Sequence, residues 1–276
     1  MEDKKKDNED ISAKKRLDVF LQSNGYAESR EKAKQLILNE CVFVNNKNVN
    51  KPSALIPCES EIIIKNKLNN YVSRGANKLE KALNFFKIDA DGSVAIDIGA
   101  STGGFTDCLL QHGAKKVYAI DVGHDQLHES LKRNKKVINI ENTNFRYINT
   151  KIFTESNDII VVDVSFISLN LILPKIIEIS EYNTDIIVLI KPQFEAGKSN
   201  IGKNGLVKDR KIHLSVLKNF NDCCHINNLY IKNITYSPIK GGNGNIEYLA
   251  HLKKGIYINF YDEQFKSIIN DAFVLL

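Results

Sequence analysis

The sequence is poor in cysteine, and the few present are not arranged for a disulfide framework or a metal site. Five cysteines, an odd number, occur in 276 residues, and two of them, Cys223 and Cys224, are adjacent. Small disulfide-bonded scaffolds are much richer in cysteine. No C-x-x-C pair occurs, so a common zinc site is not expected either. These absences predict a cytoplasmic protein with reduced thiols and no bound metal.

Long hydrophobic runs are also missing. The longest apolar stretches, Ile159–Val162 and Ile186–Ile190, have the length of strands, whereas a membrane-spanning helix needs about 20 apolar residues. Residues Met1–Asp7 are charged and contain no apolar segment, so no secretory signal is expected. The absence of a strongly cationic amphipathic helix argues against a protein that acts on membranes.

Neither sign of charge dominates the composition. The net charge is +5, the pI is near 8.7 and 26% of the residues are charged. This mildly basic balance is too weak to establish nucleic-acid binding by itself. Hydrophobic residues make up 43% of the chain, enough for a real core. The length suits one large domain, or a large and a small one.

A glycine-rich stretch is the most informative feature that the sequence does contain. Asp97–Phe105 has glycines at positions 99, 103 and 104, follows the apolar run Val94–Ile96 and precedes a helix-like segment. Glycine lets a ligand approach the backbone where a Cβ would obstruct it. Asp121 ends the next apolar run, Lys116–Ile120, at a place that suits a ribose diol. The pattern predicts a strand, turn and helix that bind a nucleoside-bearing ligand.

The spacing of these glycines differs from the G-x-G-x-x-G pattern of dinucleotide-binding turns. Asp97 opens the turn, and a carboxylate is unfavourable beside a pyrophosphate. A cationic ligand suits it better, such as the amino-acid end or the sulfonium of S-adenosylmethionine. A tight turn that binds no ligand remains the alternative, because short motifs also occur by chance.

The chain divides into segments of different character: a charged tail at 1–12, a compact module at 13–66, a linker at 67–72 and a larger domain at 73–276. In the larger domain, strand-sized apolar runs alternate with helical patterns. This alternation predicts an α/β fold with a Rossmann-like, doubly wound and mainly parallel sheet. The expected strands are 94–97, 116–120, 136–140, 159–163, 186–190, 229–235 and 247–252.

The module at 13–66 is predicted to contain two helices and a small sheet. The first helix begins at Arg16, and Ser29 is the expected N-cap of the second, Arg30–Leu38. The expected strands and turns follow at Val42–Val44, Asn45-Asn46, Val49 and Ile62–Ile64.

This small module resembles the S4 RNA-binding domain. The matching residues are Arg16-Leu17-Asp18, Ser29–Ala33, Leu36-Ile37, Val42–Asn45 and Val49–Pro52. Glu40 and Asn46 depart from the family, which usually has glycine at both positions. The resemblance implies a structured RNA partner, and the basic stretches 65–87 and 198–211 suit a phosphate backbone. For either stretch taken alone, a solvated charged face is an equal alternative. The residues expected to bind RNA are Arg16, Arg30, Lys32, Lys65, Lys67 and Arg74.

Four charged residues occupy places where an α/β sheet presents side chains to a ligand. Asp163 and Lys191 each follow an apolar strand directly, and Glu247 lies at the start of the last expected strand. Lys78 precedes the first strand of the larger domain. The carboxyl ends of parallel strands face the ligand crevice. The alternative is that these are ordinary solvated charges, the usual state of lysine and glutamate.

Together the four residues resemble the Lys-Asp-Lys-Glu tetrad of RrmJ/FtsJ-type 2′-O-methyltransferases, and the S4-like module narrows the resemblance to the TlyA family. Members of that family methylate ribosomal RNA and are also known as hemolysins. Further matching segments are Asp121–Leu127, Thr143–Arg146, Lys191–Glu195 and Ser237–Gly241. The resemblance implies 2′-O-methylation of a ribose, that of cytidine, in 16S rRNA, 23S rRNA or both.

The same resemblance implies site residues. Lys78, Asp163, Lys191 and Glu247 would be catalytic. Because a ribose hydroxyl is a poor nucleophile, Lys191 is expected to take or steer its proton, Asp163 to orient Lys191, and Lys78 with Glu247 to hold the ribose. The cofactor S-adenosylmethionine would bind through Asp97, Gly99, Ala100, Ser101, Gly103, Gly104, Phe105, Asp121, Val122 and Asn144.

Two functions of other classes stay open. The family name raises a membrane-active hemolysin, against which the absence of a signal and of a spanning segment argues. The S4-like module raises a non-catalytic RNA-binding assembly factor. The intact glycine loop and the four tetrad positions argue against that second alternative.

Overall fold

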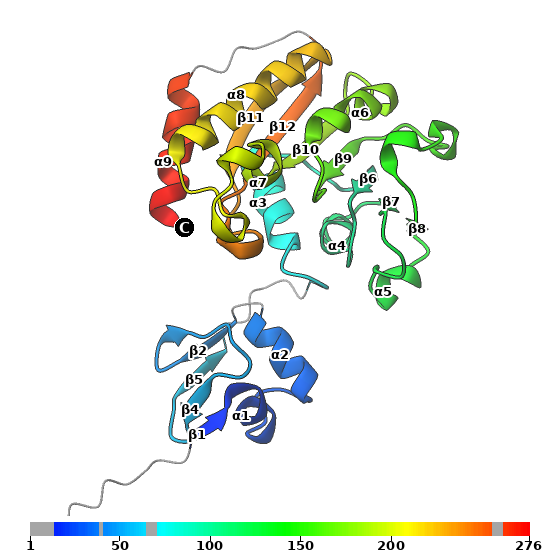
Figure 1. Ribbon diagram of the computed structural model, residues 1–276. Helices are drawn as coiled ribbons and strands as arrows, with labels where there is room; N and C mark the ends of the chain where they lie inside the picture. The colour runs from blue at the N-terminus through cyan, green and yellow to red at the C-terminus, as the bar shows by residue number, and fades with distance from the viewer. Residues whose placement is uncertain (1–13, 39–40, 65–70, 256–261) are drawn as a thin grey trace, which may run out of the picture. The chain divides into compact units, whose positions relative to one another are not determined.

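The computed structural model describes residues 14–38, 41–64, 71–255 and 262–276. The chain forms two compact units, Met1–Asn70 and Tyr71–Leu276, here called the N-terminal unit and the C-terminal unit (Figure 1). Each unit has its own hydrophobic core, as expected of separate domains. Lys65 and Lys67, the tail at 1–12 and most of the expected linker lie outside the described residues.

The described part of the N-terminal unit contains two helices and five short strands. Leu17, Phe20, Leu21 and Ile37 on the helices pack against Val42 and other strand residues. The elements are β1 (Lys14–Arg16), α1 (Leu17–Ser23), α2 (Arg30–Leu38), β2 (Val42–Val44), β3 (Lys47–Asn48), β4 (Leu55–Pro57) and β5 (Ile62–Ile64). β2 pairs with β3 and β5, and β1 pairs with β4, all antiparallel.

The sequence pattern of this unit predicted its helices and strands correctly, with small shifts in their bounds. Ser29 Oγ accepts a hydrogen bond from the backbone N–H of Lys32 at 3.1 Å, so it caps α2 as predicted. Asn45 and Asn46 have φ of 48° and 64°, the left-handed conformation that asparagine tolerates. One expectation was wrong, because Arg16 ends β1 rather than beginning the helix: its backbone pairs with Leu55 of β4.

The C-terminal unit is built on a seven-stranded sheet in the order β11-β12-β10-β9-β6-β7-β8. The strands β10, β9, β6, β7 and β8 are mutually parallel, while β12 is antiparallel to both of its neighbours. The bounds are β6 (Val94–Ile98), β7 (Lys116–Ile120), β8 (Val137–Ile140), β9 (Ile159–Val162), β10 (Asp185–Ile190), β11 (Leu229–Tyr236) and β12 (Tyr248–Lys254).

Helices cover both faces of this sheet (Figure 1). One face packs on α3 (Ala76–Phe86) and α4 (Gly104–Gln111). The other packs on α6 (Leu173–Ile179), α8 (Arg210–Ile226) and α9 (Asp262–Leu275). The short helices are α5 (Glu129–Lys132) and α7 (Pro192–Glu195), with 3-10 turns at Phe145–Tyr147, Thr150–Ile152, Leu169–Leu171, Lys198–Asn200, Lys203–Gly205 and Gly242–Gly244.

These features confirm the predicted fold class. All seven expected strands are present, each within two residues of its expected bounds. Alternate residues of the central strands enter opposite cores: Ile96 and Ile98 lie on the α6–α8 face, and Ala95 lies on the α3–α4 face. This double burial explains why the strands read as continuous apolar runs. Among the described helices, none has the length and apolar character required to cross a membrane.

Candidate active site

The pleat of the sheet places four charged residues on the face covered by α3 and α4. Side chains two positions apart along a strand point to the same side. Each of the four lies two positions from a residue of the α3–α4 core: Asp97 from Ala95, Asp163 from Val161, Lys191 from Leu189, and Glu247 from Leu249.

Glu247 joins this group because β12 runs antiparallel to β10. Tyr248, the first residue of β12, pairs with Ile190, the last residue of β10. Glu247 and Lys191 therefore lie at the same edge of the sheet although 56 residues separate them. Lys78 reaches this edge from the first turn of α3, where its side chain is buried.

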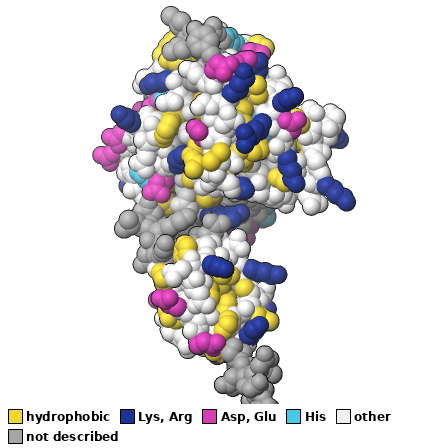
Figure 2. Space-filling view, turned by 90° about the vertical axis from the view of Figure 1, so that its left-hand side faces the viewer, with side chains coloured by type: hydrophobic (Ala, Val, Ile, Leu, Met, Phe, Trp, Pro, Cys, Tyr) yellow, Lys and Arg dark blue, Asp and Glu magenta, His cyan; other side chains and the backbone are white. Residues whose placement is uncertain are grey.

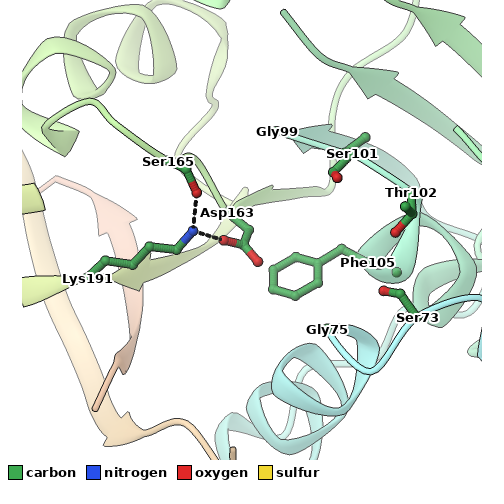
Figure 3. A pocket seen from close by; sticks show the side chains of 11 residues that line it. Ser73, Gly75, Gly99, Ser101, Thr102, Phe105, Asp163, Ser165 and Lys191 are labelled. Atoms are coloured by element: carbon green, nitrogen blue, oxygen red, sulfur yellow. Dashed lines mark hydrogen bonds and ion pairs between the residues drawn. The ribbon is translucent and has the colours of Figure 1, made fainter. Parts of the chain in front are cut away.

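Four side chains form one continuous series of ion pairs. Lys78 Nζ lies 2.7 Å from Glu247 Oε2 and 3.8 Å from Asp163 Oδ2. On the other side of Asp163, its Oδ1 lies 2.6 Å from Lys191 Nζ. Lys191 Nζ also donates a hydrogen bond of 2.8 Å to Ser165 Oγ, as Figure 3 shows. The structure thus brings together all four residues of the predicted tetrad.

Burial makes this series of charges interdependent. Lys78 and Lys191 are each 8% exposed and Glu247 is 1% exposed. Two cations alternate with two anions, so each charge has a partner of opposite sign. Removing one partner from a buried pair costs about 3 to 5 kcal/mol because the other charge is left uncompensated. The arrangement therefore holds the two lysine side chains at fixed positions beside an open cavity.

Three cavities meet at this edge of the sheet. The first, about 190 Å³, lies between the glycine loop, Ser73 and Lys191, and is here called the loop cavity (Figure 3). The second, about 460 Å³, extends past Asp121 and is called the strand-end cavity. The third, about 650 Å³, contains Lys78, Lys191 and Glu247 in its wall and is called the lysine cavity. The two larger volumes fall in the range of ligand pockets.

Most of the predicted cofactor residues line the first two cavities. Gly99, Ala100, Ser101, Gly104 and Phe105 are in the wall of the loop cavity. The strand-end cavity adds the other expected residues: Asp121, Val122 and Asn144.

Asp121 is held by the backbone on either side of it. Its Oδ2 accepts a hydrogen bond from Ser101 N at 2.8 Å, and its Oδ1 accepts one from Gly123 N at 2.7 Å. Each carboxylate oxygen retains acceptor capacity for a hydroxyl group. The carboxylate is therefore fixed in direction and still able to bind a diol.

Two predicted cofactor residues line none of the three cavities. Asp97 is fully buried and its Oδ2 accepts a 2.7 Å hydrogen bond from Thr106 Oγ1 on α4. Burial raises the pKa of the Asp97 carboxyl to about 7. Gly103 has φ of +92°, and a Cβ there would meet the side chains of Leu127 and Leu131. Packing against these two leucines therefore explains why residue 103 is glycine.

Comparison with known proteins agrees with this geometry. The family of FtsJ-like methyltransferases matches residues 71–254, and the S4 domain family matches residues 15–62. The chain belongs to the FtsJ-like methyltransferase family. The resemblance to TlyA proteins is confirmed by similarity to the 16S/23S rRNA (cytidine-2′-O)-methyltransferase TlyA of Mycobacterium tuberculosis, with 35% identity over 88% of this chain and 91% of that one.

Other relatives carry a different name. The chain is 46% identical to "Hemolysin A" of Brachyspira hyodysenteriae over 86% of this chain and 98% of that protein. A solved structure of a candidate hemolysin from Streptococcus thermophilus is 42% identical and superposes with a TM-score of 0.75, covering 96% of this chain and 98% of that one. The same architecture therefore appears under two functional names.

Sequence reasoning assigned no role to Ser165 or to its neighbour Phe166. Phe166 is 91% exposed, has φ of +63°, and lies with its ring centroid 5.1 Å from that of Phe194. It lines both the strand-end cavity and the lysine cavity. A bulky residue in a left-handed conformation is strained, and strained residues of this kind cluster at functional sites. In the sequence, the one indication of such a role was that Phe166 follows closely after Asp163, at the end of a strand.

Two of the predicted RNA-binding residues share a buried partner in the N-terminal unit. Asp18 is fully buried, and its carboxylate accepts hydrogen bonds of 3.0 Å from both Arg16 and Arg30. These bonds, led by that from Arg16, lower the pKa of Asp18 to about 2. The two guanidinium groups are half exposed, so Asp18 holds them in fixed positions at the surface.

The remaining predicted RNA-binding residues are exposed or undescribed. Lys32 and Arg74 are exposed. On the face of the molecule in Figure 2, lysine and arginine side chains are interspersed with acidic ones, so that face is of mixed charge. A face of mixed charge attracts a phosphate backbone less strongly than a uniformly basic one.

Substitution of Gly99 by alanine is expected to lower the free energy of unfolding by about 2 to 4 kcal/mol. Gly99 has φ of +86°, and a Cβ would lie 2.5 Å from the backbone oxygen of Asp163. Urea unfolding measures the change. Gly92→Ala is the matched control, because Gly92 also has positive φ but open space around its Cβ position. Equal losses for the two variants would contradict the predicted clash with Asp163.

Proposed function

We propose that the protein transfers the methyl group of S-adenosylmethionine to a ribose 2′-hydroxyl, that of cytidine, in ribosomal RNA. The observation that carries the proposal is the series of ion pairs from Glu247 through Lys78 and Asp163 to Lys191. It lies where the cavity lined by the glycine loop meets the lysine cavity. A methyl donor and a ribose placed in these two cavities would meet at Lys191.

The described residues fit S-adenosylmethionine. The loop cavity and the strand-end cavity share Gly99, Ser101, Asp163 and Ser165 in their walls. Asp121 is suited to the ribose diol of the donor, and the apolar side chains of Val122 and Ile172 to its adenine. When bound, the donor supplies a methyl group that is already activated. Holding the two reactants in line then contributes most of the rate.

The tetrad residues have separate tasks in this proposal. Lys191 receives or steers the proton of the attacking 2′-hydroxyl, since it lines both the loop cavity and the lysine cavity. Asp163 orients Lys191 through the 2.6 Å contact between Oδ1 and Nζ. Lys78 and Glu247 hold the ribose. A positioned acid or base of this kind contributes about 10²- to 10⁴-fold to a rate.

The proposed substrate rests on the N-terminal unit and on the relatives. Arg16 and Arg30, fixed by Asp18, present two cations at the surface of a unit that matches the S4 domain. Structured RNA is recognised chiefly through its shape and its phosphates. The relative from Mycobacterium tuberculosis carries in its name both 16S and 23S rRNA and the cytidine 2′-O position.

Mapping of 2′-O-methyl groups tests the function directly. Ribosomal RNA from cells with and without the gene is compared, and the purified protein is supplied with the unmethylated RNA and labelled S-adenosylmethionine. We expect at least one cytidine to lose its methyl group without the gene and to regain it in vitro. Identical methylation maps would contradict the proposal.

The hemolysin name of some relatives gives a second candidate function. Purified protein is mixed with dye-loaded lipid vesicles and, separately, titrated with S-adenosylmethionine in a calorimeter. Methyl-donor binding without vesicle lysis supports the enzyme. Lysis by a tetrad variant that is inactive in methyl transfer would support the membrane activity instead. Absence of donor binding would favour an RNA-binding assembly factor.

A further inference from the structure

Ser165 lies where all three cavities meet. Among the residues that line the loop, strand-end and lysine cavities, it alone belongs to all three walls. Its hydroxyl accepts a hydrogen bond from Lys191 Nζ at 2.8 Å. Resting on the proposed function, we propose that Ser165 is a positioning residue that aims the Lys191 amine at the methyl-accepting hydroxyl.

The geometry at Lys191 explains why a second partner is needed. A lysine amine has three positions around nitrogen besides its own carbon. Ser165 Oγ occupies one of them through a hydrogen bond of 2.8 Å, whereas Asp163 Oδ1, 2.6 Å away, is an ion-pair partner and is not in line for a hydrogen bond. The Ser165 hydrogen bond therefore sets the rotation about the last carbon–nitrogen bond. The remaining positions on the nitrogen then have fixed directions, and one of them is available to the substrate.

The Asp163 ion pair alone holds the amine near the carboxylate but does not set the rotation about the Cε–Nζ bond. The two contacts come from different parts of one short segment, since Asp163 follows β9 directly and Ser165 lies two residues further. Figure 3 shows both side chains directed at the end of Lys191. A near-attack arrangement requires reacting atoms within about 3 to 3.5 Å, so loss of this alignment slows the chemical step.

The segment that carries Ser165 is itself anchored. Glu195, in the short helix α7 that follows Lys191, accepts hydrogen bonds from Ser168 Oγ at 2.7 Å and from Leu169 N at 2.8 Å. Residues 165–169 are thus connected to the Lys191 segment twice, once through Ser165 and Lys191 and once through Glu195. Ser165 itself is exposed, so its hydroxyl can be removed without opening a cavity in the core.

The test compares three variants in steady-state methyl transfer to ribosomal RNA. For Ser165→Ala we expect kcat to fall about ten- to hundredfold, the equivalent of one hydrogen bond to a charged group. The KM for RNA and the Kd for S-adenosylmethionine should stay near their wild-type values. Ser165→Thr retains the hydroxyl and should restore most of kcat.

Ser156→Ala is the matched control. Ser156 precedes the same strand, β9, and its hydroxyl also bonds a charged side chain, Glu181 Oε1, at 2.8 Å. It should retain wild-type kcat. Wild-type kcat in Ser165→Ala, or equal losses in Ser165→Ala and Ser165→Thr, would overturn the role of Ser165. A wild-type protein that transfers no methyl group would instead overturn the proposed function.

Discussion

Replacement of Lys191 by alanine is expected to lower kcat for methyl transfer by about a thousandfold or more. The amine of Lys191 is the one group of the tetrad that lines both the loop cavity and the lysine cavity. Its removal also leaves Asp163 without its 2.6 Å partner. Transfer of a labelled methyl group to ribosomal RNA under single-turnover conditions measures the chemical step directly.

Controls separate this loss from misfolding and from loss of the donor. Lys175→Ala also removes an ion-paired lysine, since Lys175 Nζ lies 2.6 Å from Glu178 Oε2 on α6, but it lines none of the three cavities. This variant should retain full activity. Lys191→Ala should still bind S-adenosylmethionine, as measured by calorimetry. Full methyl transfer by Lys191→Ala would show that another group handles the proton.

Replacement of Asp97 by asparagine is expected to stabilise the free protein above neutral pH. Burial raises the pKa of Asp97 from 3.8 to about 7, and its Oδ1 has no hydrogen-bond partner among the described residues. Because its pKa is raised in the folded state, protonated Asp97 contributes its full share to the free energy of unfolding below about pH 4. That share is lost as the pH rises through 7. Relative to wild type, the variant should gain up to about 4 kcal/mol between pH 4 and pH 8.

The same substitution should weaken binding of the methyl donor. A buried carboxylate that is costly in the free protein is compensated when a cation binds beside it. Because Asp97 is fully buried and lines none of the three cavities, it acts on the donor through its charge, and we expect Asp97→Asn to raise the Kd for S-adenosylmethionine about tenfold. Wild-type binding should tighten between pH 6 and pH 8, and binding by the variant should not.

Thermal unfolding at pH 5 and pH 8, with calorimetry at both, measures the two effects of Asp97 together. Thr106→Val is an informative companion, because it removes the 2.7 Å hydrogen bond to Asp97 Oδ2 but keeps the carboxyl. Unchanged donor affinity in Asp97→Asn would contradict a role for Asp97 in binding. It would leave Asp97 as a buried polar partner of α4.

Much of this fold could be predicted from the sequence because the central strands are buried on both faces. Each gives a continuous apolar run, and a charged residue directly after such a run marks the carboxyl edge of the sheet. Asp163 and Lys191 were found in this way. Lys78 and Glu247 were singled out by their positions next to strands, but their role came from the resemblance, because nothing local shows that α3 and an antiparallel strand reach the same edge.

Other parts of the site depend on distances that the sequence does not contain. Ser165 is defined by its 2.8 Å contact with Lys191, which is 26 residues away. The pairing of Asp18 with Arg30 likewise joins two helices. Asp97 was expected to face a ligand, but its strand position also places it against Thr106 of α4. Only the packing of the helix on the sheet reveals the depth of that burial.

The position of β12 has a consequence for how the protein comes into being. This strand lies inside the sheet, between β11 and β10, yet it ends at residue 254 of 276. During synthesis, β10 therefore remains an unpaired edge strand while more than fifty further residues are added. The last carboxylate of the tetrad arrives with that strand. A nascent chain is consequently without its complete tetrad until the last strand of the sheet has been made. Premature stops before β12 should give aggregation-prone fragments.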